Sequence, residues 1–401
     1  MSTRKLRIGI AGLGRAFSIM LPALASEKLE IVAGADPRPE ACERFKADFK
    51  ARAFETVEEM CADPSVEAVY ISTPHGLHRA NVEAAAANGK HVLVEKPMAL
   101  TLEDCRAMTE AARAAGVVLI VGHSHSFDLP VVRAREIIAS GAVGELKMIT
   151  ASYFTDFLYR PRRREELDTA QGGGVIYNQA PHQVDVVRLL GGGRVKSVRA
   201  NVGIWDLARP TEGAYQALLT FESGATASLT YSGYAHYDGD ELTDWVTEGG
   251  LPKDPSRYGV TRKALSAAAN LEAEELLKNR VNYGGEGYAG SPNASKGPER
   301  FHQHFGHVIA SCQRADLRPT PKGVHVYGDT GRRFEALASP RIYRDEVIDE
   351  LYSAVVNGAP VIHSGEWATA TMEVCLAMLD SHAQGGEIWL SHQVGIEGRT
   401  A

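Results

Sequence analysis

The sequence has few of the features that mark a membrane protein, a disulfide-bonded secreted protein or a nucleic-acid-binding protein. Its five cysteines are odd in number and scattered, and none has the C-x-x-C spacing of a zinc site. No stretch approaches the roughly 18 consecutive apolar residues that suggest a membrane span. The formal net charge of -7 gives no general attraction for nucleic acid or anionic lipid. We therefore expect a cytoplasmic protein with a small-molecule partner and with no nucleic acid and no membrane among its partners.

What is present is a globular composition of 44% hydrophobic and 23% charged residues, in a chain of 401 residues that exceeds what one hydrophobic core usually supports. Strand and helix patterns alternate regularly in residues 1–123, which predicts an α/β domain with a doubly wound parallel sheet. In residues 124–401, consecutive extended stretches joined by hairpin turns predict an α+β domain with a large, mainly antiparallel sheet. Within it, residues from about 234 to 298 form an irregular insertion with a helix of its own.

A glycine turn follows the first apolar run and precedes a helical pattern, which is the order of a dinucleotide-binding site. Phe17 stands at the third position of this fingerprint, where a small residue is expected. The second strand ends at Asp36, where a carboxylate accepts hydrogen bonds from the ribose hydroxyls and favours NAD, while Arg38 leaves NADP open and a turn cap is the alternative for Asp36. The residues that we expect around the dinucleotide in this part are Gly12, Leu13, Gly14, Arg15, Ala16, Asp36 and Arg38.

The stretch around which the rest is organised is a short apolar strand, Val92–Val94, followed at once by Glu95, Lys96 and Pro97. Lys96 is therefore expected at the carboxyl end of a buried strand, where open α/β sheets bind their ligands. An ammonium beside a carboxylate at such a place is either a structural ion pair or a proton-transfer group.

A second group of polar residues follows a run of three glycines, Gly172–Gly174. On one helix, Asn178, His182 and Asp185 would share a face, although Pro181 indicates that the helix begins after Asn178 or is distorted there. An imidazole accepts a hydroxyl proton, whereas an amide hydrogen-bonds without charge. We therefore expect His182 to act in proton transfer and Asn178 to position the substrate. A core histidine bonded to a backbone carbonyl is the alternative for His182.

Upstream of the three glycines lies a basic run, Arg160-Pro161-Arg162-Arg163-Arg164. It is either solvated surface or a set of guanidinium groups that bind a carboxylated substrate. The histidines at 123 and 125 would face opposite sides of a strand, and of those at 302, 304 and 307 only the last two have helical spacing, so no metal is expected. The further residues expected to bind substrate are His123, His125, Tyr153, Arg160, Arg162, Arg163 and Arg164.

Taken together, these motifs resemble the Gfo/Idh/MocA family, named for glucose-fructose oxidoreductase and inositol dehydrogenase. The residues that carry the resemblance are Gly12-Leu13-Gly14, Thr73-Pro74 with His78, Gly89-Lys90-His91-Val92 and Glu95-Lys96-Pro97. The resemblance implies a Rossmann domain that binds NAD, with Lys96 in the active site and Ser72, Thr73, Pro74, His78 and Glu95 around the nicotinamide. In the second motif His182 and Asp185 match the family, but Asn178 replaces an aspartate. The family's second domain also pairs subunits, which implies a homodimer or homotetramer.

The region from Ser311 through Asp329 to the C-terminus is similar to a branch of the family that includes phthalate 4,5-cis-dihydrodiol dehydrogenases. The resemblance implies NAD-dependent oxidation of cis-4,5-dihydro-4,5-dihydroxyphthalate to 4,5-dihydroxyphthalate, with Lys96 and His182 at the departing hydroxyl proton. An NAD(P)-dependent sugar, cyclitol or glycoside dehydrogenase is the alternative enzyme. A dinucleotide-binding sensor without catalysis is the alternative of another class. Phe17 and Asn178 permit the sensor, and the presence of both Lys96 and His182 opposes it.

Overall fold

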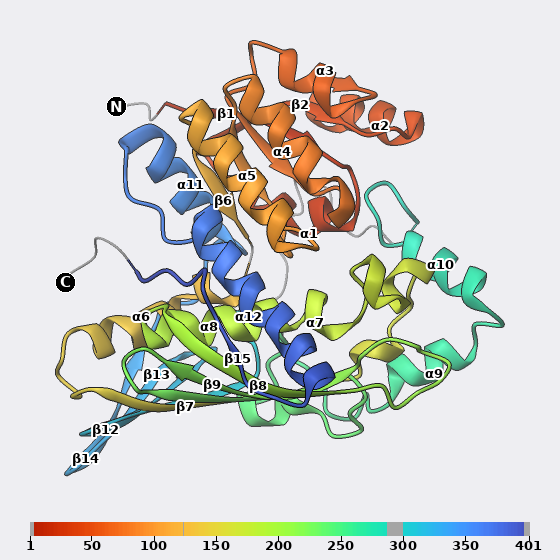
Figure 1. Ribbon diagram of the computed structural model, residues 1–401. Coiled ribbons are helices and arrows are strands. Elements are labelled where there is room, and N and C mark those ends of the chain that lie inside the picture. The colour runs from red at the N-terminus through yellow and green to blue at the C-terminus, as the bar shows by residue number, and fades with distance from the viewer. Residues whose placement is uncertain (1–3, 123, 287–299, 397–401) are drawn as a thin grey trace. The chain divides into compact units, whose positions relative to one another are not determined.

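A computed structural model describes residues 4–122, 124–286 and 300–396, which form two compact units (Figure 1). The first unit comprises Met1–His123 and the later segments Leu276–Gly297 and Arg341–Thr369. The second comprises Ser124–Glu275, Pro298–Pro340 and Ala370–Ala401. The division of the sequence into domains at residues 123 and 124 stays a prediction, and the contacts of the two later segments with the first unit are described below.

The first unit is built on a six-stranded sheet in the order β3-β2-β1-β4-β5-β6, with every pair of neighbours parallel. The order reverses between β1 and β4, which is the switch point where the carboxyl ends of strands open a crevice for a dinucleotide. The strands are β1 (Leu6–Ala11), β2 (Leu29–Ala35), β3 (Arg52–Phe54), β4 (Ala68–Ile71), β5 (His91–Val94) and β6 (Leu119–Val121).

The helices of this unit begin and end where local signals predict. The Thr101 hydroxyl accepts a hydrogen bond from the Asp104 N–H at the start of α5, and Gly116 ends that helix with a φ of 65°. The crossover helices are α1 (Arg15–Leu24), α2 (Pro39–Phe49), α3 (Val57–Ala62), α4 (His78–Ala87) and α5 (Leu102–Ala115), with the 3₁₀ turn η1 (His75–Leu77) before α4.

Two late segments join this unit through specific contacts. Helix α11 (Asp345–Asn357) places the Tyr352 hydroxyl 2.6 Å from the carbonyl oxygen of Arg4, and its Asp349 pairs with Lys28. Beyond α11, the His363 carbonyl accepts a hydrogen bond of 2.9 Å from the Val121 N–H at the end of β6. These partners lie more than 200 residues apart in the sequence, so no local pattern indicates them.

The second unit is built on a nine-stranded sheet in the order β14-β13-β12-β11-β7-β10-β9-β8-β15. All neighbours are antiparallel except β7 and β10, which run parallel because β10 returns beside β7 only after α8, β8 and β9. The prediction of a mainly antiparallel sheet is therefore confirmed. The strands are β7 (Leu146–Phe154), β8 (Val195–Gly203), β9 (Ala214–Phe221), β10 (Thr226–Ser232), β11 (His307–Cys312), β12 (Ala315–Thr320), β13 (Gly323–Gly328), β14 (Gly331–Ala336) and β15 (Ile388–Trp389).

Helices α6 and α8 cover one face of this sheet (Figure 1). Helix α7 ends at Asn178 and α8 begins at Ala180, because Pro181 lacks the N–H that a continuous helix would need there. Among the described residues no helix has both the length and the apolar character to cross a membrane. The helices are α6 (Leu129–Ala139), α7 (Gly174–Asn178), α8 (Ala180–Gly191), α9 (Val260–Ser266), α10 (Leu271–Asn279) and α12 (Gly365–Gln384), and the 3₁₀ turns are η2 (His125–Phe127), η3 (Phe157–Tyr159), η4 (Arg164–Leu167), η5 (Thr169–Gln171) and η6 (Gly239–Thr243).

Candidate active site

The glycine turn after β1 has the geometry of a pyrophosphate site. Gly12 has a φ of 87°, and a Cβ there would lie 2.9 Å from the backbone of Ser72, so only glycine fits. A Cβ on Gly14 would meet nothing within 4 Å, which leaves the space above the first turn of α1 open to a ligand. Arg15 and Ala16 form that first turn, and the Arg15 guanidinium donates to the carbonyl of Val281.

Asp36 lies at the end of β2 and closes the same turn. Its carboxylate accepts hydrogen bonds from the Leu13 N–H at 2.8 Å and from Arg38 Nε at 2.8 Å and Nη2 at 3.0 Å. Burial opposes ionisation, but the hydrogen bonds from Arg38 and Leu13 outweigh it and lower the pKa of Asp36. Asp36, which favours NAD, and Arg38, which leaves NADP open, thus form an ion pair with each other.

Phe17 departs from the fingerprint because a later segment packs against it. Its fully buried ring lies 6.1 Å from that of Phe45 and 5.0 Å from that of Tyr283, measured between centroids. The Tyr283 hydroxyl donates to Asp48 on α2 at 2.7 Å. An aromatic cluster therefore replaces the close helix-to-strand contact that a third glycine would allow. The tight turn at Gly12 is still present.

The carboxyl ends of β4 and β5 carry the residues expected around the nicotinamide. The Ser72 hydroxyl donates to the Gly12 carbonyl at 2.7 Å, and Thr73 and Pro74 follow. His78 is buried between carbonyl oxygens, with Nε2 3.0 Å from that of Thr73 and Nδ1 3.1 Å from that of Pro97. His78 therefore ties together the two loops that follow β4 and β5.

Glu95 and Lys96 differ in their environments. Glu95 is buried, and burial raises the pKa of its carboxyl, although Arg344 and the Tyr70 hydroxyl, which donates to Glu95 at 2.6 Å, act in the opposite direction. Lys96 is half-buried and precedes a cis peptide bond to Pro97. The Glu95 carboxylate is thus turned into the core, while Lys96, two residues after the end of β5, is only partly covered.

In the second unit, His125 and His182 come together. Their ring centroids are 4.8 Å apart, and the ring of Phe305 packs 5.3 Å from His125 and 5.0 Å from His182. His125 Nδ1 lies 2.7 Å from a carboxylate oxygen of Asp128, and Nε2 lies 3.5 Å from Glu248. Burial opposes the imidazolium, but Asp128 and Glu248 raise the pKa of His125 above its usual value. His125 belongs to the turn η2 and not to a strand, which corrects the predicted strand, and His123 lies outside the described residues.

The remaining members of the second motif have structural contacts. The Asn178 amide donates to the carbonyls of Gly172 at 3.0 Å and Gly174 at 2.8 Å, which holds the glycine turn in place. Asp185 accepts hydrogen bonds from the hydroxyls of Thr371, Ser124 and Ser126 inside the unit. Asn178 and Asp185 thus hold neighbouring loops and helices together, while His182 packs against His125.

The arginine run also divides. Arg162 is buried with its guanidinium 3.7 Å from the centroid of the Phe157 ring and 3.5 Å from Glu166, and burial lowers its pKa to about 10. Arg164 is exposed, and Arg163 is half-buried and donates from its backbone N–H to Glu166. Arg160 is exposed and lines a cavity. Of the four arginines predicted to bind substrate, Arg160 is the one among the residues that line this cavity.

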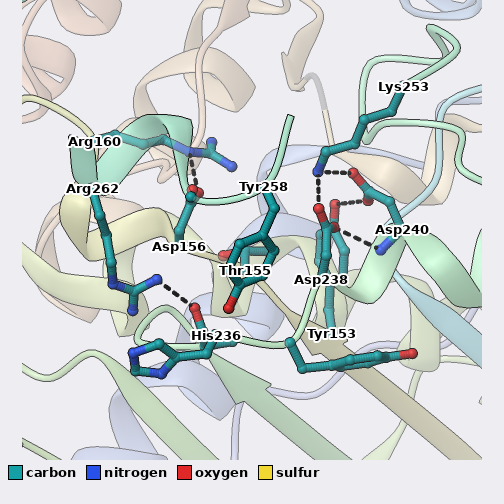
Figure 2. Close-up of a pocket in the computed structure, with 13 residues that line it drawn as sticks. Tyr153, Thr155, Asp156, Arg160, His236, Asp238, Asp240, Lys253, Tyr258 and Arg262 are labelled. Atoms are coloured by element: carbon teal, nitrogen blue, oxygen red, sulfur yellow. Dashed lines mark hydrogen bonds and ion pairs between the residues drawn. The ribbon is translucent and has the colours of Figure 1, made fainter. Parts of the chain in front are cut away.

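Figure 2 shows this cavity, which has a volume of about 110 Å³ and is partly open to solvent. Arg160 pairs with Asp156 at 3.7 Å on one side, and Lys253 pairs with Asp238 and Asp240 on the other. Tyr153 lines the cavity, and its ring packs edge-on 5.2 Å from the Phe305 ring that contacts both imidazoles. The contact between the Tyr153 and Phe305 rings thus links the lining of the cavity to the histidine pair.

The sequence did not single out Glu248, Asp128 or Phe305. Glu248 lies in the irregular insertion, where no periodicity marks a position, and Asp128 looks like an ordinary residue before the proline of α6. The spacing His125-x-x-Asp128 is the one local signal, because residues three apart on a turn face each other.

Comparison with known proteins agrees with this architecture. Residues 6–123 match the oxidoreductase family with an NAD-binding Rossmann fold, and residues 131–251 match the GFO/IDH/MocA C-terminal domain. The chain is 48% identical over 378 residues, 94% of each protein, to 1-carboxy-3-chloro-3,4-dihydroxycyclohexa-1,5-diene dehydrogenase of Comamonas testosteroni. It is 30% identical over 232 residues to trans-1,2-dihydrobenzene-1,2-diol dehydrogenase of Mus musculus, covering 57% of this chain and 68% of that protein.

A solved structure from Bordetella bronchiseptica RB50 matches 96% of this chain and 100% of its own with a TM-score of 0.89 and 42% identity. The predicted resemblance, the fold and the NAD cofactor are thus confirmed. The chain belongs to the Gfo/Idh/MocA family of NAD-binding oxidoreductases.

Proposed function

We propose that this oxidoreductase is a dehydrogenase of ring dihydrodiols that bear a carboxylate, and that the cis-4,5-dihydrodiol of phthalate is its best candidate substrate. The observation that carries the proposal is the 48% identity, over 94% of both chains, to a dehydrogenase named for a carboxylated dihydroxycyclohexadiene. Arg160 in the cavity is a suitable partner for a carboxylate, because a guanidinium binds a carboxylate through two parallel hydrogen bonds.

The proposed chemistry oxidises one carbinol of the ring. Bound NAD supplies the acceptor for the hydride that leaves the carbinol carbon. Lys96 and His182 are the two proposed acceptors for the hydroxyl proton, and a carbonyl double bond forms as the O–H and C–H bonds break. The resulting hydroxyketone tautomerises to a catechol, and the gain of aromaticity makes the oxidation favourable. The chain itself orients the diol and receives one proton.

Selectivity for a carboxylated ring follows from the cavity. Besides Arg160, its cations are Lys253, which pairs with two aspartates, and Arg262, which donates to the carbonyls of Ala235 and Tyr234. Arg160 is held by a longer contact of 3.7 Å to Asp156, so a substrate carboxylate can replace that partner at lower cost. A second carboxylate, as in the phthalate diol, would need a further partner.

A substrate panel tests the proposal. Purified protein and NAD are mixed with the phthalate cis-dihydrodiol, a monocarboxylated dihydrodiol, an uncharged dihydrodiol, a sugar and a cyclitol, and the absorbance of the reduced cofactor is followed. We expect the highest kcat/KM on a carboxylated dihydrodiol. A preference for the sugar or cyclitol would replace the proposal with the alternative enzyme. Tight NAD binding without turnover of any compound would instead favour a sensor.

A further inference from the structure

Three side chains from separate parts of the second unit bring possible metal ligands together. They are His125 in η2, His182 in the first turn of α8, and Glu248 in the insertion. One ligand atom from each lies within 4.8 Å of the other two. Two imidazoles and a carboxylate form a ligand set that holds zinc in catalytic sites, where the fourth position is left to water or substrate.

The distance between two of these atoms fits a shared cation. His125 Nε2 and Glu248 Oε1 are 3.5 Å apart. Two ligands on a tetrahedral zinc ion, each bonded at about 2.0–2.1 Å, are about 3.4 Å apart. The third ligand atom, on His182, lies within 4.8 Å of the other two, so binding one ion requires it to move closer to them.

The outer surroundings of His125 also match those of a metal ligand. Its Nδ1 lies 2.7 Å from Asp128, whose second carboxylate oxygen accepts a hydrogen bond from Gln303 at 3.4 Å. A carboxylate in this position keeps the hydrogen on Nδ1 and directs the Nε2 lone pair away from it, here toward Glu248. Two acceptors then face each other, and either a proton or a metal cation between them makes that approach favourable.

The cluster is enclosed but remains accessible from one side. Both histidines are buried against the Phe305 ring, which fixes their orientation, while the Glu248 side chain is 29% exposed. Imidazole ligands suit zinc and its neighbours in the first transition row and do not suit magnesium or calcium, which prefer oxygen. The site is therefore matched to a transition-metal cation with one position open.

We propose that His125, His182 and Glu248 bind one divalent transition-metal cation, with zinc the best match, and that the open position takes a hydroxyl oxygen of the substrate. The metal site does not depend on the proposed function. The assignment of a substrate hydroxyl to the open position does rest on that function. A cation in this place stabilises the alkoxide that forms as the hydroxyl proton leaves. His182 is then a ligand and not a proton acceptor, and Lys96 alone receives the proton.

Zinc titration of the whole chain tests the first part. Protein freed of metal with EDTA is titrated calorimetrically with Zn²⁺, without NAD or diol, alongside the variants Glu248→Gln, Asp128→Asn and the control Glu241→Gln, an exposed residue of η6. We expect one zinc per chain, a loss of affinity of at least about 100-fold in E248Q and of about 10- to 100-fold in D128N, and no change in E241Q. Absence of zinc binding, or equal affinity in E248Q and the unaltered protein, would overturn the site.

Cobalt substitution tests the second part and separates the two proposals. Co²⁺ in a tetrahedral site absorbs visible light, and we expect the spectrum to change when the dihydrodiol is added; an unchanged spectrum would overturn the hydroxyl ligand. Dehydrogenation that persists unaltered in EDTA-treated, metal-free protein would overturn the cation's catalytic part and leave the proposed function intact. Zinc binding without oxidation of any diol would overturn the proposed function and leave the metal site intact.

Discussion

We expect the Asp36 carboxylate to set the preference for NAD over NADP, and replacing it with serine tests this role. The carboxylate accepts four hydrogen bonds, from the backbone N–H groups of Leu13 and Arg38 and from Nε and Nη2 of Arg38. It also stands where the ribose hydroxyls of NAD are bound in this fold. A hydrogen bond to a charged group contributes about 1.5–3 kcal/mol, so the Asp36→Ser variant should bind NADH about 10- to 150-fold more weakly.

The affinity for NADPH should change in the opposite direction. A carboxylate and a phosphate charge about 5 Å apart repel each other by about 3 kcal/mol at an effective dielectric constant of about 20, so removing the carboxylate should improve NADPH binding by up to about 100-fold. The substitution also releases Arg38, whose Nε and Nη2 are now held by Asp36, to bind the additional phosphate.

Fluorescence titration with NADH and NADPH measures both dissociation constants without requiring a substrate. The double variant Asp36→Ser with Arg38→Gln is the matched control, because it lacks the guanidinium and should lose most of the gain for NADPH. A change in NADH affinity of less than about 2-fold in Asp36→Ser, against the expected value of at least about 10-fold, would show that Asp36 is a turn cap and does not contact the ribose.

Three further predictions concern the substrate cavity, the aromatic cluster and pH. Arg160→Gln should raise KM about 10-fold or more for a carboxylated dihydrodiol, while Arg164→Gln, at an exposed position outside the cavity, should leave KM unchanged. Equal effects of the two substitutions in steady-state kinetics would show that Arg160 does not bind the substrate carboxylate. Phe17→Ala should destabilise the first unit by about 3–5 kcal/mol because the ring is fully buried, and urea unfolding followed by NADH binding measures this; a loss below about 1 kcal/mol would contradict the packing. Because the folded pKa of Asp36 lies below its unfolded value of about 3.9, the ionised carboxylate stabilises the fold above that pH, and this contribution is lost as the pH falls through the folded pKa. The melting temperature of Asp36→Asn should therefore fall less than that of the unaltered protein on acidification from neutral pH, and equal falls would contradict the direction of the shift.

Elements with signals inside their own segments were predictable from the sequence. Helix α5 has a threonine cap at its start and a left-handed glycine at its end, and both lie next to the residues they affect. The hairpin between β9 and β10 turns at Gly224 with a φ of 85°, which the dipeptide Ser223-Gly224 indicates directly. The position of Lys96 followed from the same kind of local pattern, a short apolar strand with an abrupt polar end.

Features that depend on distant partners were not predictable. Tyr283 explains Phe17 but lies 266 residues away, in a segment without regular periodicity. Arg162 looks like surface within a run of arginines, yet its planar guanidinium packs on the Phe157 ring and is buried. Glu248 becomes a candidate metal ligand only because the fold places His125 and His182 beside it.

We expect the amine of Lys96 to receive a proton during oxidation of a ring dihydrodiol, and the Lys96→Met variant decides whether it does. A methionine keeps the length and apolar stem of the side chain and removes the charge. With NADH affinity measured by fluorescence and turnover by absorbance, we expect binding to change by less than about 3-fold and kcat to fall by about 100-fold or more, while the exposed control Lys147→Met leaves both unchanged. A kcat in Lys96→Met equal to that of the unaltered protein would contradict the account.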